Sequence, residues 1–339
     1  MTETSDICVI IAAKNASATI ARAVTSALAE PETREVVVID DGSTDATGEA
    51  AGAADDGSGR LQIVRFEANR GPAAARNHAV DISHAPLVAI LDADDFFLPG
   101  RFRQLLSQPD WDFIADNIAF VDEMRASRAH LEIEHFQPHS RTISLADFIE
   151  GNISRRGVRR GEIGFLKPVM RRDFLASHGL RYKEELRLGE DYDLYARALI
   201  KGARYKVIHS CGYGAVVRHN SLSGSHRTQD LKRLYEADRA MLTDPELSAD
   251  AASLIRRHEA HIRGRYELRH FLDLKNNEGL AAALRYALTH PAAFPAIAGG
   301  ILADKTERFV KPRDAAPVAL GGSGGLRYLL PAVPETVQK

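Results

Sequence analysis

The first hundred residues alternate between short apolar runs and helix-like stretches, and this alternation constrains the fold more than any other feature. The apolar runs lie at 7–13, 35–40, 61–66 and 86–91, with helical patterns between them. Nearly continuous apolar strands joined by helices are typical of a parallel sheet that is buried on both faces. We therefore predict an α/β domain built on a doubly wound sheet.

In sheets of this kind, ligands bind at the carboxyl ends of the strands. The residues at the four strand ends are Ala12 to Asn15, Asp40 to Gly42, Asn69 to Gly71 and Asp92 to Asp95. The first turn, AAKNASAT, has no glycine, and G-x-x-x-x-G-K-[ST] occurs nowhere in the chain. A dinucleotide-binding G-x-G-x-x-G turn and a P-loop are therefore excluded. The strand ends carry acids instead, which predicts a different ligand chemistry.

Charge and cysteine content narrow the range of partners and compartments. The 44 basic and 46 acidic residues leave a formal charge of −2, so nothing in the overall charge favours nucleic acid as a partner. Cys8 and Cys211 are too few for a disulfide framework, which favours the cytoplasm. No secretory signal or long uncharged apolar run is visible, so we expect neither export nor a membrane span.

The stretch LDADDFF places three acids directly after a strand. Asp92, Asp94 and Asp95 repel one another unless a cation or several hydrogen-bond donors neutralise them. Carboxylate oxygens suit hard cations such as Mg²⁺ or Mn²⁺, which often bind through one or two carboxylates and the substrate's phosphates. The alternative is a solvated acidic turn that caps the helix expected near 102–106.

Two further motifs each have a functional and a structural interpretation. In VVVIDDGSTD, a carboxylate of Asp40 or Asp41 could accept the N3–H of a pyrimidine base, or Asp41 or Ser43 could cap the following helix. In NRGPAAARN, Arg70 could lie against a base or reach a phosphate, or it could be an exposed turn residue.

The stretch GEDYDLYARAL places two acids, Glu190 and Asp191, at the start of an amphipathic helix. They could compensate the helix dipole, or one of them could act as a general base.

Together, VIIAAKNASATIARAVTSAL, VVVIDDGSTD, NRGPAAARNHAV, LDADDFFLPGRF and GEDYDLYARAL resemble the family 2 glycosyltransferases, in particular those that assemble bacterial exopolysaccharides. The resemblance covers roughly residues 6 to 220, and the order and spacing of the motifs make it specific. It implies the GT-A fold, in which a Rossmann-like, mostly parallel sheet flanked by helices binds a nucleotide sugar.

The resemblance also assigns roles to individual residues. It makes Asp191 the catalytic base, Asp41 the uracil contact, and Asp94 the favoured ligand of a Mn²⁺ or Mg²⁺ ion, with Asp92 near the ribose or the metal. His219 could approach the metal or the diphosphate, although a lone histidine is more often structural. The implied nucleotide-sugar site comprises Ala12, Ala13, Asn15, Asp40, Asp41, Arg70, Asp92, Ala93 and Glu190.

The function implied is an inverting, metal-dependent transfer of a hexose from a UDP-sugar, with UDP-glucose one candidate. The acceptor implied is a hydroxyl of a glycan or lipid-linked oligosaccharide. Trp111 is the only tryptophan, so the Gln-x-x-Arg-Trp motif of processive synthases is absent and single-sugar transfer is expected. Two alternatives stay open: a nucleotidyltransferase of related α/β fold, and a non-catalytic protein that binds sugar nucleotides.

The domain organisation expected is a glycosyltransferase domain, a helical extension and a tail. The domain spans 1–226, with a nucleotide-sugar half at about 1–100 and an acceptor half at about 101–226. The helical extension spans 227–312, and a flexible tail spans 313–339. Within the extension, 282–309 could touch a membrane peripherally or form a helical pair packed on the domain.

Overall fold

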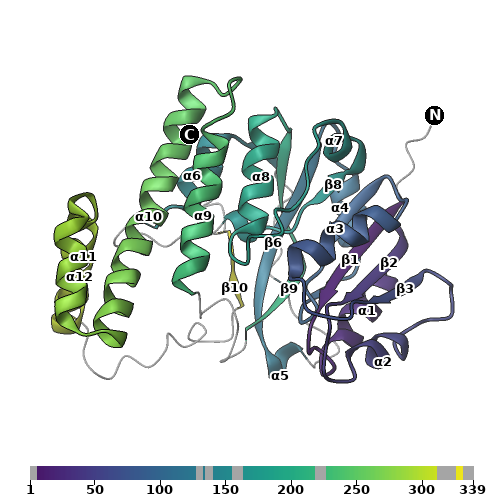
Figure 1. The fold of residues 1–339 in the computed structure, drawn as a ribbon. Coiled ribbons are helices and arrows are strands. Elements are labelled where there is room, and N and C mark those ends of the chain that lie inside the picture. Colours follow the sequence, from purple (N-terminus) through teal and green to yellow (C-terminus); the bar gives the residue numbers. More distant parts are fainter. Residues whose placement is uncertain are drawn as a thin grey trace. The chain divides into compact units, whose positions relative to one another are not determined.

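The computed structural model describes residues 6–126, 133, 140–154, 163–217, 227–310 and 326–330 of the chain (Figure 1). The chain divides into two compact units. The first comprises residues 1–221 together with 326–339, and the second comprises residues 222–325.

The first half of the first unit is a parallel sheet. Its strands are β1 (Ile7–Ala13), β2 (Thr33–Asp40), β3 (Leu61–Arg65) and β4 (Leu87–Ile90), which lie in the order β3-β2-β1-β4. β1 is the central strand, and all but one of its residues are buried, as expected for a strand covered on both faces. Ala13 lies beside Asp40 in the register, so β1 and β2 end at the same edge of the sheet.

Three helices connect these strands, namely α1 (Ile20–Leu28), α2 (Thr47–Gly52) and α3 (Pro72–Ile82). α3 packs against β1 and β2. It begins with a proline, whose fixed φ suits the first helical turn. The residue before it, Gly71, has φ 94°, a conformation that glycine adopts without steric cost.

The second half of the sheet is mixed. Its strands are β5 (Phe96–Phe97), β6 (Phe113–Asp122), β7 (Ser140–Ile143), β8 (Val169–Arg171) and β9 (Tyr205–Val217). β8 runs antiparallel to both β4 and β6, whereas β6 and β9 are parallel, and the order continues as β4-β8-β6-β9-β5 (Figure 1). The predicted α/β class and GT-A architecture are confirmed.

Helices and one 3-10 turn accompany this half of the sheet. They are α4 (Arg101–Leu106), α5 (Glu123–Ala126), α6 (Leu145–Asn152), η1 (Ile163–Phe165), α7 (Arg172–Ser177) and α8 (Glu190–Ile200). α8 is the amphipathic helix expected from GEDYDLYARAL, and its first two residues are Glu190 and Asp191.

A short segment near the C-terminus completes the first unit. β10 (Arg327–Tyr328) pairs antiparallel with β6. Leu330 exchanges two hydrogen bonds with the buried amide of Asn117, at 2.8 and 3.0 Å. Residues 326–330 fall within the flexible tail expected from 313 onward, and backbone pairing and this amide hold them on the sheet.

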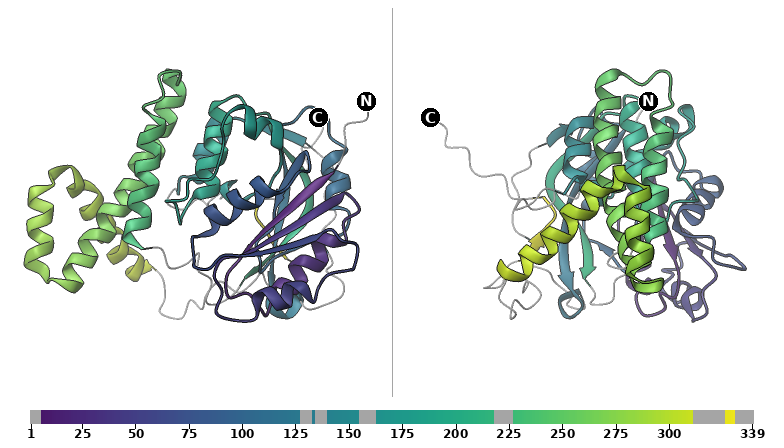
Figure 2. Two further views of the ribbon diagram at one scale, coloured as in Figure 1. Left: turned by 45° about the vertical axis from the view of Figure 1, so that its right-hand side comes forward. Right: turned by 60° about the vertical axis from the view of Figure 1, so that its left-hand side comes forward.

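The second unit is helical, as predicted for the C-terminal region (Figure 2). It contains α9 (Thr228–Met241), α10 (Ala249–Asn277), α11 (Leu280–Thr289), the 3-10 turn η3 (Pro291–Ala293) and α12 (Phe294–Val310). α9 packs along α10, and the buried ring of His258 lies 2.7 Å from the carboxylate of Asp238. None of the described helices is both long enough and apolar enough to cross a membrane.

Candidate active site

The two acids that end β2 are buried, and each is bound by the backbone of a neighbouring turn. Asp41 accepts the amide hydrogens of Arg70 at 2.6 Å and Gly71 at 2.8 Å. Asp40 accepts the amide hydrogen of Ser43 at 3.0 Å. α2 has no side-chain cap, so Asp41 and Ser43 do not act as its N-cap. Asp41 instead fixes the turn that leads into α3.

The end of β1 is tied to the same turn. Asn15 has φ 49°, and its backbone N–H donates to the Ser43 hydroxyl at 2.9 Å. The amide oxygen of Asn15 accepts the Thr44 N–H at 2.9 Å, and the carbonyl of Ala13 accepts from Asp41 at 2.8 Å. The residues from Ala12 to Asn15 and the acid pair are therefore linked at one edge of the sheet.

Arg70 lies on the surface beside this turn. Its guanidinium stacks over the Phe66 ring at 4.8 Å and lies 3.6 Å from Glu184. About half of its side chain is exposed. The stacked guanidinium could therefore receive a base or a phosphate from solvent, and that role stays a prediction.

The acidic turn after β4 is not a solvated cap. Asp95 is buried and accepts hydrogen bonds from the Tyr213 hydroxyl and the Val216 N–H, both at 2.8 Å. Burial, together with the charges of Asp92 and Asp94, raises the pKa of Asp95 to about 8.

The start of α4 is capped by Glu30, which follows the end of α1. The carboxylate of Glu30 accepts the backbone N–H groups of Gly100 and Phe102. Ala93 is also buried.

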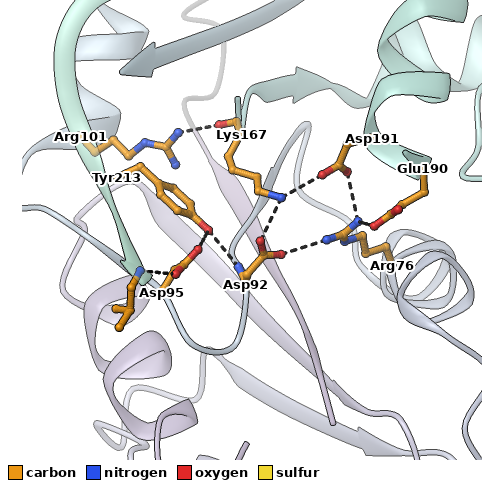
Figure 3. A network of polar contacts seen from close by, with 9 residues as sticks. Arg76, Asp92, Asp95, Arg101, Lys167, Glu190, Asp191 and Tyr213 are labelled. Carbon is orange, nitrogen blue, oxygen red and sulfur yellow. Dashed lines mark hydrogen bonds and ion pairs between the residues drawn. The ribbon is translucent and has the colours of Figure 1, made fainter. Parts of the chain in front are cut away.

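The first acid of that turn belongs to a network of five charged side chains (Figure 3). Arg76, on α3, donates to Asp92 at 2.9 Å and to Glu190 and Asp191 at 3.1 Å each. Lys167, which lies just before β8, is 2.9 Å from Asp191 and 3.0 Å from Asp92. The start of α8 and the end of β4, a hundred residues apart, thus meet around two cations.

The ion pairs in this network determine the charge states of Asp92 and Lys167. Burial alone would raise the pKa of Asp92, but Lys167 and Arg76 outweigh it and hold that pKa at about 2. Burial likewise opposes the charged form of Lys167, yet Asp191 and Asp92 keep its pKa above the ordinary value. Burial raises the pKa of Glu190. Asp92 is therefore a carboxylate, and Lys167 an ammonium ion, at neutral pH.

Arg76 is fixed by more than its ion pairs. Its guanidinium lies over the Tyr182 ring at 5.3 Å. Asn77, the next residue on α3, exchanges hydrogen bonds with both the carbonyl and the N–H of Tyr182, at 2.9 and 3.0 Å. Since Asp41 fixes the start of α3, the same helix connects the β2 turn to the charged network.

A divalent cation fits this site if a nucleotide shares its coordination. Among the described residues, no three His, Cys, Asp or Glu side chains are arranged to hold a metal. Asp92 is paired with Arg76 and Lys167, and Asp95 with Tyr213. Asp94 is the acid of this motif that the family resemblance favours as the metal ligand. Mg²⁺ and Mn²⁺ often bind through one or two carboxylates and substrate phosphates, and the carboxylates of this turn suit that mode of binding.

His219 lies outside the described part of the chain, so its role stays a prediction.

Two residues that organise the charged network, Arg76 and Lys167, were not predicted from the sequence. The available signal was a charged residue in a segment otherwise suited to burial: Arg76 follows PAAA at the start of α3, and Lys167 stands in GFLKPVM. Neither segment indicates which acids would pair with the charged residue that it contains.

The profile of glycosyl transferase family 2 matches residues 8–174 of this chain. The succinoglycan biosynthesis protein ExoU of Rhizobium meliloti is 72% identical over 326 residues, covering 96% of this chain and 95% of that protein. ExoO of the same organism, also named for succinoglycan biosynthesis, is 36% identical and covers 92% of both chains.

The chain belongs to glycosyltransferase family 2. Its fold resembles that of S. aureus TarS, solved in complex with UDP-GlcNAc, with a TM-score of 0.56, 19% identity, and 80% of this chain and 74% of that one covered. The predicted family, its link to exopolysaccharide assembly and the enzyme class are confirmed. Membership of this family decides against the nucleotidyltransferase and the non-catalytic binding protein. The family commonly uses a divalent metal.

Proposed function

We propose that this glycosyltransferase moves one hexose, with inversion, from a UDP-sugar to a hydroxyl of a growing glycan during succinoglycan biosynthesis. The similarity to ExoU over nearly the whole chain supports the pathway. A bound UDP-sugar in the structurally similar TarS supports a nucleotide-sugar donor. The observation that carries the chemistry is that Arg76 and Lys167 each bridge Asp191 and Asp92, in one charged network at the carboxyl edge of the sheet.

Asp191 is the proposed general base. The acceptor hydroxyl loses its proton to this carboxylate as its oxygen attacks the anomeric carbon, and the bond from that carbon to the diphosphate oxygen breaks. One displacement inverts the configuration at the anomeric carbon. A diphosphate is a good leaving group, so no carboxylic acid is required to protonate it, in contrast to a glycosidase.

Asp94, and Asp92 if it leaves its ion pairs, would hold the Mn²⁺ or Mg²⁺ ion. When bound, this ion supplies positive charge that stabilises the departing diphosphate. Arg76 keeps Asp191 and Asp92 in place through paired hydrogen bonds. Asp41 and Arg70 would contact the nucleoside of the donor. The carboxylate of Asp41 already accepts two backbone N–H groups, and its other lone pairs would accept the uracil N3–H.

The acceptor is proposed to be lipid-linked, and the enzyme to work at the cytoplasmic side of the membrane. The second unit supports a peripheral contact, because Leu280, Leu284 and Leu288 form an exposed stripe on α11 and Phe294 is also exposed. A helix with one apolar face can lie in the membrane interface without spanning it.

A donor screen tests the proposed function. We expect metal-dependent release of UDP from a UDP-hexose in the presence of the glycan acceptor, and no comparable release from GDP-sugars. Preference for a GDP-sugar would contradict the uridine assignment and leave the family unchanged. Absence of any transfer with the full donor set would contradict the proposed activity.

A further inference from the structure

Both carboxylate oxygens of Asp191, the proposed base, are paired with cations in the free enzyme. One oxygen of Asp191 accepts from Arg76 at 3.1 Å, and the other is 2.9 Å from the Lys167 ammonium. A cation held against a carboxylate opposes proton transfer to it, because the proton would displace a favourable charge interaction. In this state a sugar hydroxyl must compete with Arg76 and Lys167 for the oxygens of the carboxylate.

The two cations differ in how firmly they are held. Arg76 binds three carboxylates with a planar fork and lies over the Tyr182 ring. Lys167 carries a compact charge at the end of a flexible stem, and its carbonyl is fixed by a 2.6 Å hydrogen bond from the buried Arg101. The backbone of Lys167 is thus anchored, while among the described residues its ammonium is paired with Asp92 and Asp191 (Figure 3).

The network is exposed at one end. The side chain of Asp92 is 34% exposed, whereas Arg76 is 5% and Lys167 7% exposed. Solvent therefore reaches the network on the side of Asp92, and there the Lys167 ammonium, 3.0 Å from Asp92, is the group that attracts an anion. A lysine ammonium is a common phosphate ligand, because a point charge needs no fixed geometry.

We propose that Lys167 couples donor binding to activation of the base: it bridges Asp92 and Asp191 in the free enzyme, moves to the donor diphosphate when the nucleotide sugar binds, and so releases Asp191. This inference rests on the proposed function. Lys167 competes for two anions, the Asp191 carboxylate and the diphosphate. Asp191 and the nucleotide should therefore oppose one another's binding to Lys167.

Calorimetric titration of UDP in the presence of Mn²⁺ tests this competition. Lys167→Met should weaken UDP binding about tenfold or more, since a charged hydrogen bond to the diphosphate is lost. Asp191→Asn should tighten UDP binding about threefold or more, because Lys167 loses a competing carboxylate. In Lys167→Met/Asp191→Asn that gain should vanish. Uridine, which lacks phosphates, should bind all variants alike.

Lys183→Met is the matched control. Lys183 also pairs with an acid of α8, at 2.9 Å from Asp193, but does not contact Asp92 or Asp191. It should leave UDP affinity unchanged. Lys167→Arg keeps the charge and should bind UDP within about threefold of the parent.

The outcomes separate this inference from the proposed function. If the parent protein binds neither UDP nor a UDP-sugar, the proposed function fails and the inference fails with it. If the parent binds UDP and Lys167→Met binds it equally well, only the inference is overturned. If Lys167→Met lowers the affinities for uridine and UDP equally, Lys167 is a structural residue, and the inference is also overturned. Should Lys167→Met not fold, Asp191→Asn decides alone, and unchanged or weaker UDP binding refutes the competition.

Discussion

Replacing Asp191 with asparagine separates its two possible roles. Asparagine keeps the size of the side chain and one oxygen acceptor but cannot take a proton. If Asp191 is the base, the transfer rate should fall by about 10²–10⁴-fold, which corresponds to roughly 2.7–5.5 kcal/mol in the activation barrier. UDP affinity should not fall, because the base itself makes no bond to the diphosphate, and it should rise about threefold or more if Lys167 is released to the diphosphate.

The structural role predicts a different result. Asp191 stands in the first turn of α8 and pairs with Arg76 and Lys167, both of which keep Asp92 as a partner. If Asp191 only compensated the helix dipole and these cations, its replacement would cost about 1–3 kcal/mol of stability and leave turnover of the folded protein nearly unchanged.

Asp193→Asn is the control for this experiment. Asp193 lies in the same helical turn, is fully buried and pairs with Lys183 at 2.9 Å and Arg197 at 2.6 Å. It should lose stability without losing transfer rate per folded molecule. Melting temperature, donor affinity and rate are measured on both variants. Near-normal transfer by Asp191→Asn would refute the assignment and move it to Glu190.

Three further substitutions test other parts of the account. Asp94→Ala should abolish the dependence of UDP affinity on Mn²⁺, and calorimetry showing the parent's metal dependence intact would contradict Asp94 as ligand. Asp41→Asn should weaken UDP binding by roughly 1.5–3 kcal/mol if the uracil contact is buried, with GDP as the comparison nucleotide. Asn117→Ala should lower the free energy of unfolding by about 1–3 kcal/mol, since Leu330 loses both hydrogen bonds to this side chain. An unchanged melting temperature would show that these two hydrogen bonds contribute nothing to stability.

The sequence predicted the parallel half of the fold well. Strands expected at 7–13 and 35–40 appear as Ile7–Ala13 and Thr33–Asp40, because a strand buried on both faces must be apolar throughout. The short strands Phe96–Phe97 and Arg327–Tyr328 could not be found in this way. Two residues give no periodicity, and only contacts with distant strands select their conformation.

The sequence motifs contain the acids of the charged network, whereas its two cations, Arg76 and Lys167, were not predicted. Asp92 and Asp191 stand in recognisable motifs, whereas the partners of Lys167 lie at positions far from it in sequence. The capping interpretations were wrong for a related reason. Glu30, about 70 positions away, caps the backbone at Gly100 and Phe102, which no local pattern reveals.

The anomeric configuration of the product shows whether transfer is a single displacement. A single displacement at the anomeric carbon, assisted by Asp191, must give a glycosidic bond whose configuration is opposite to that of the sugar nucleotide. Nuclear magnetic resonance of the product formed from a UDP-hexose and the glycan acceptor reads this configuration from the anomeric proton. We expect complete inversion, and a product with the donor's own configuration would contradict a single displacement assisted by Asp191.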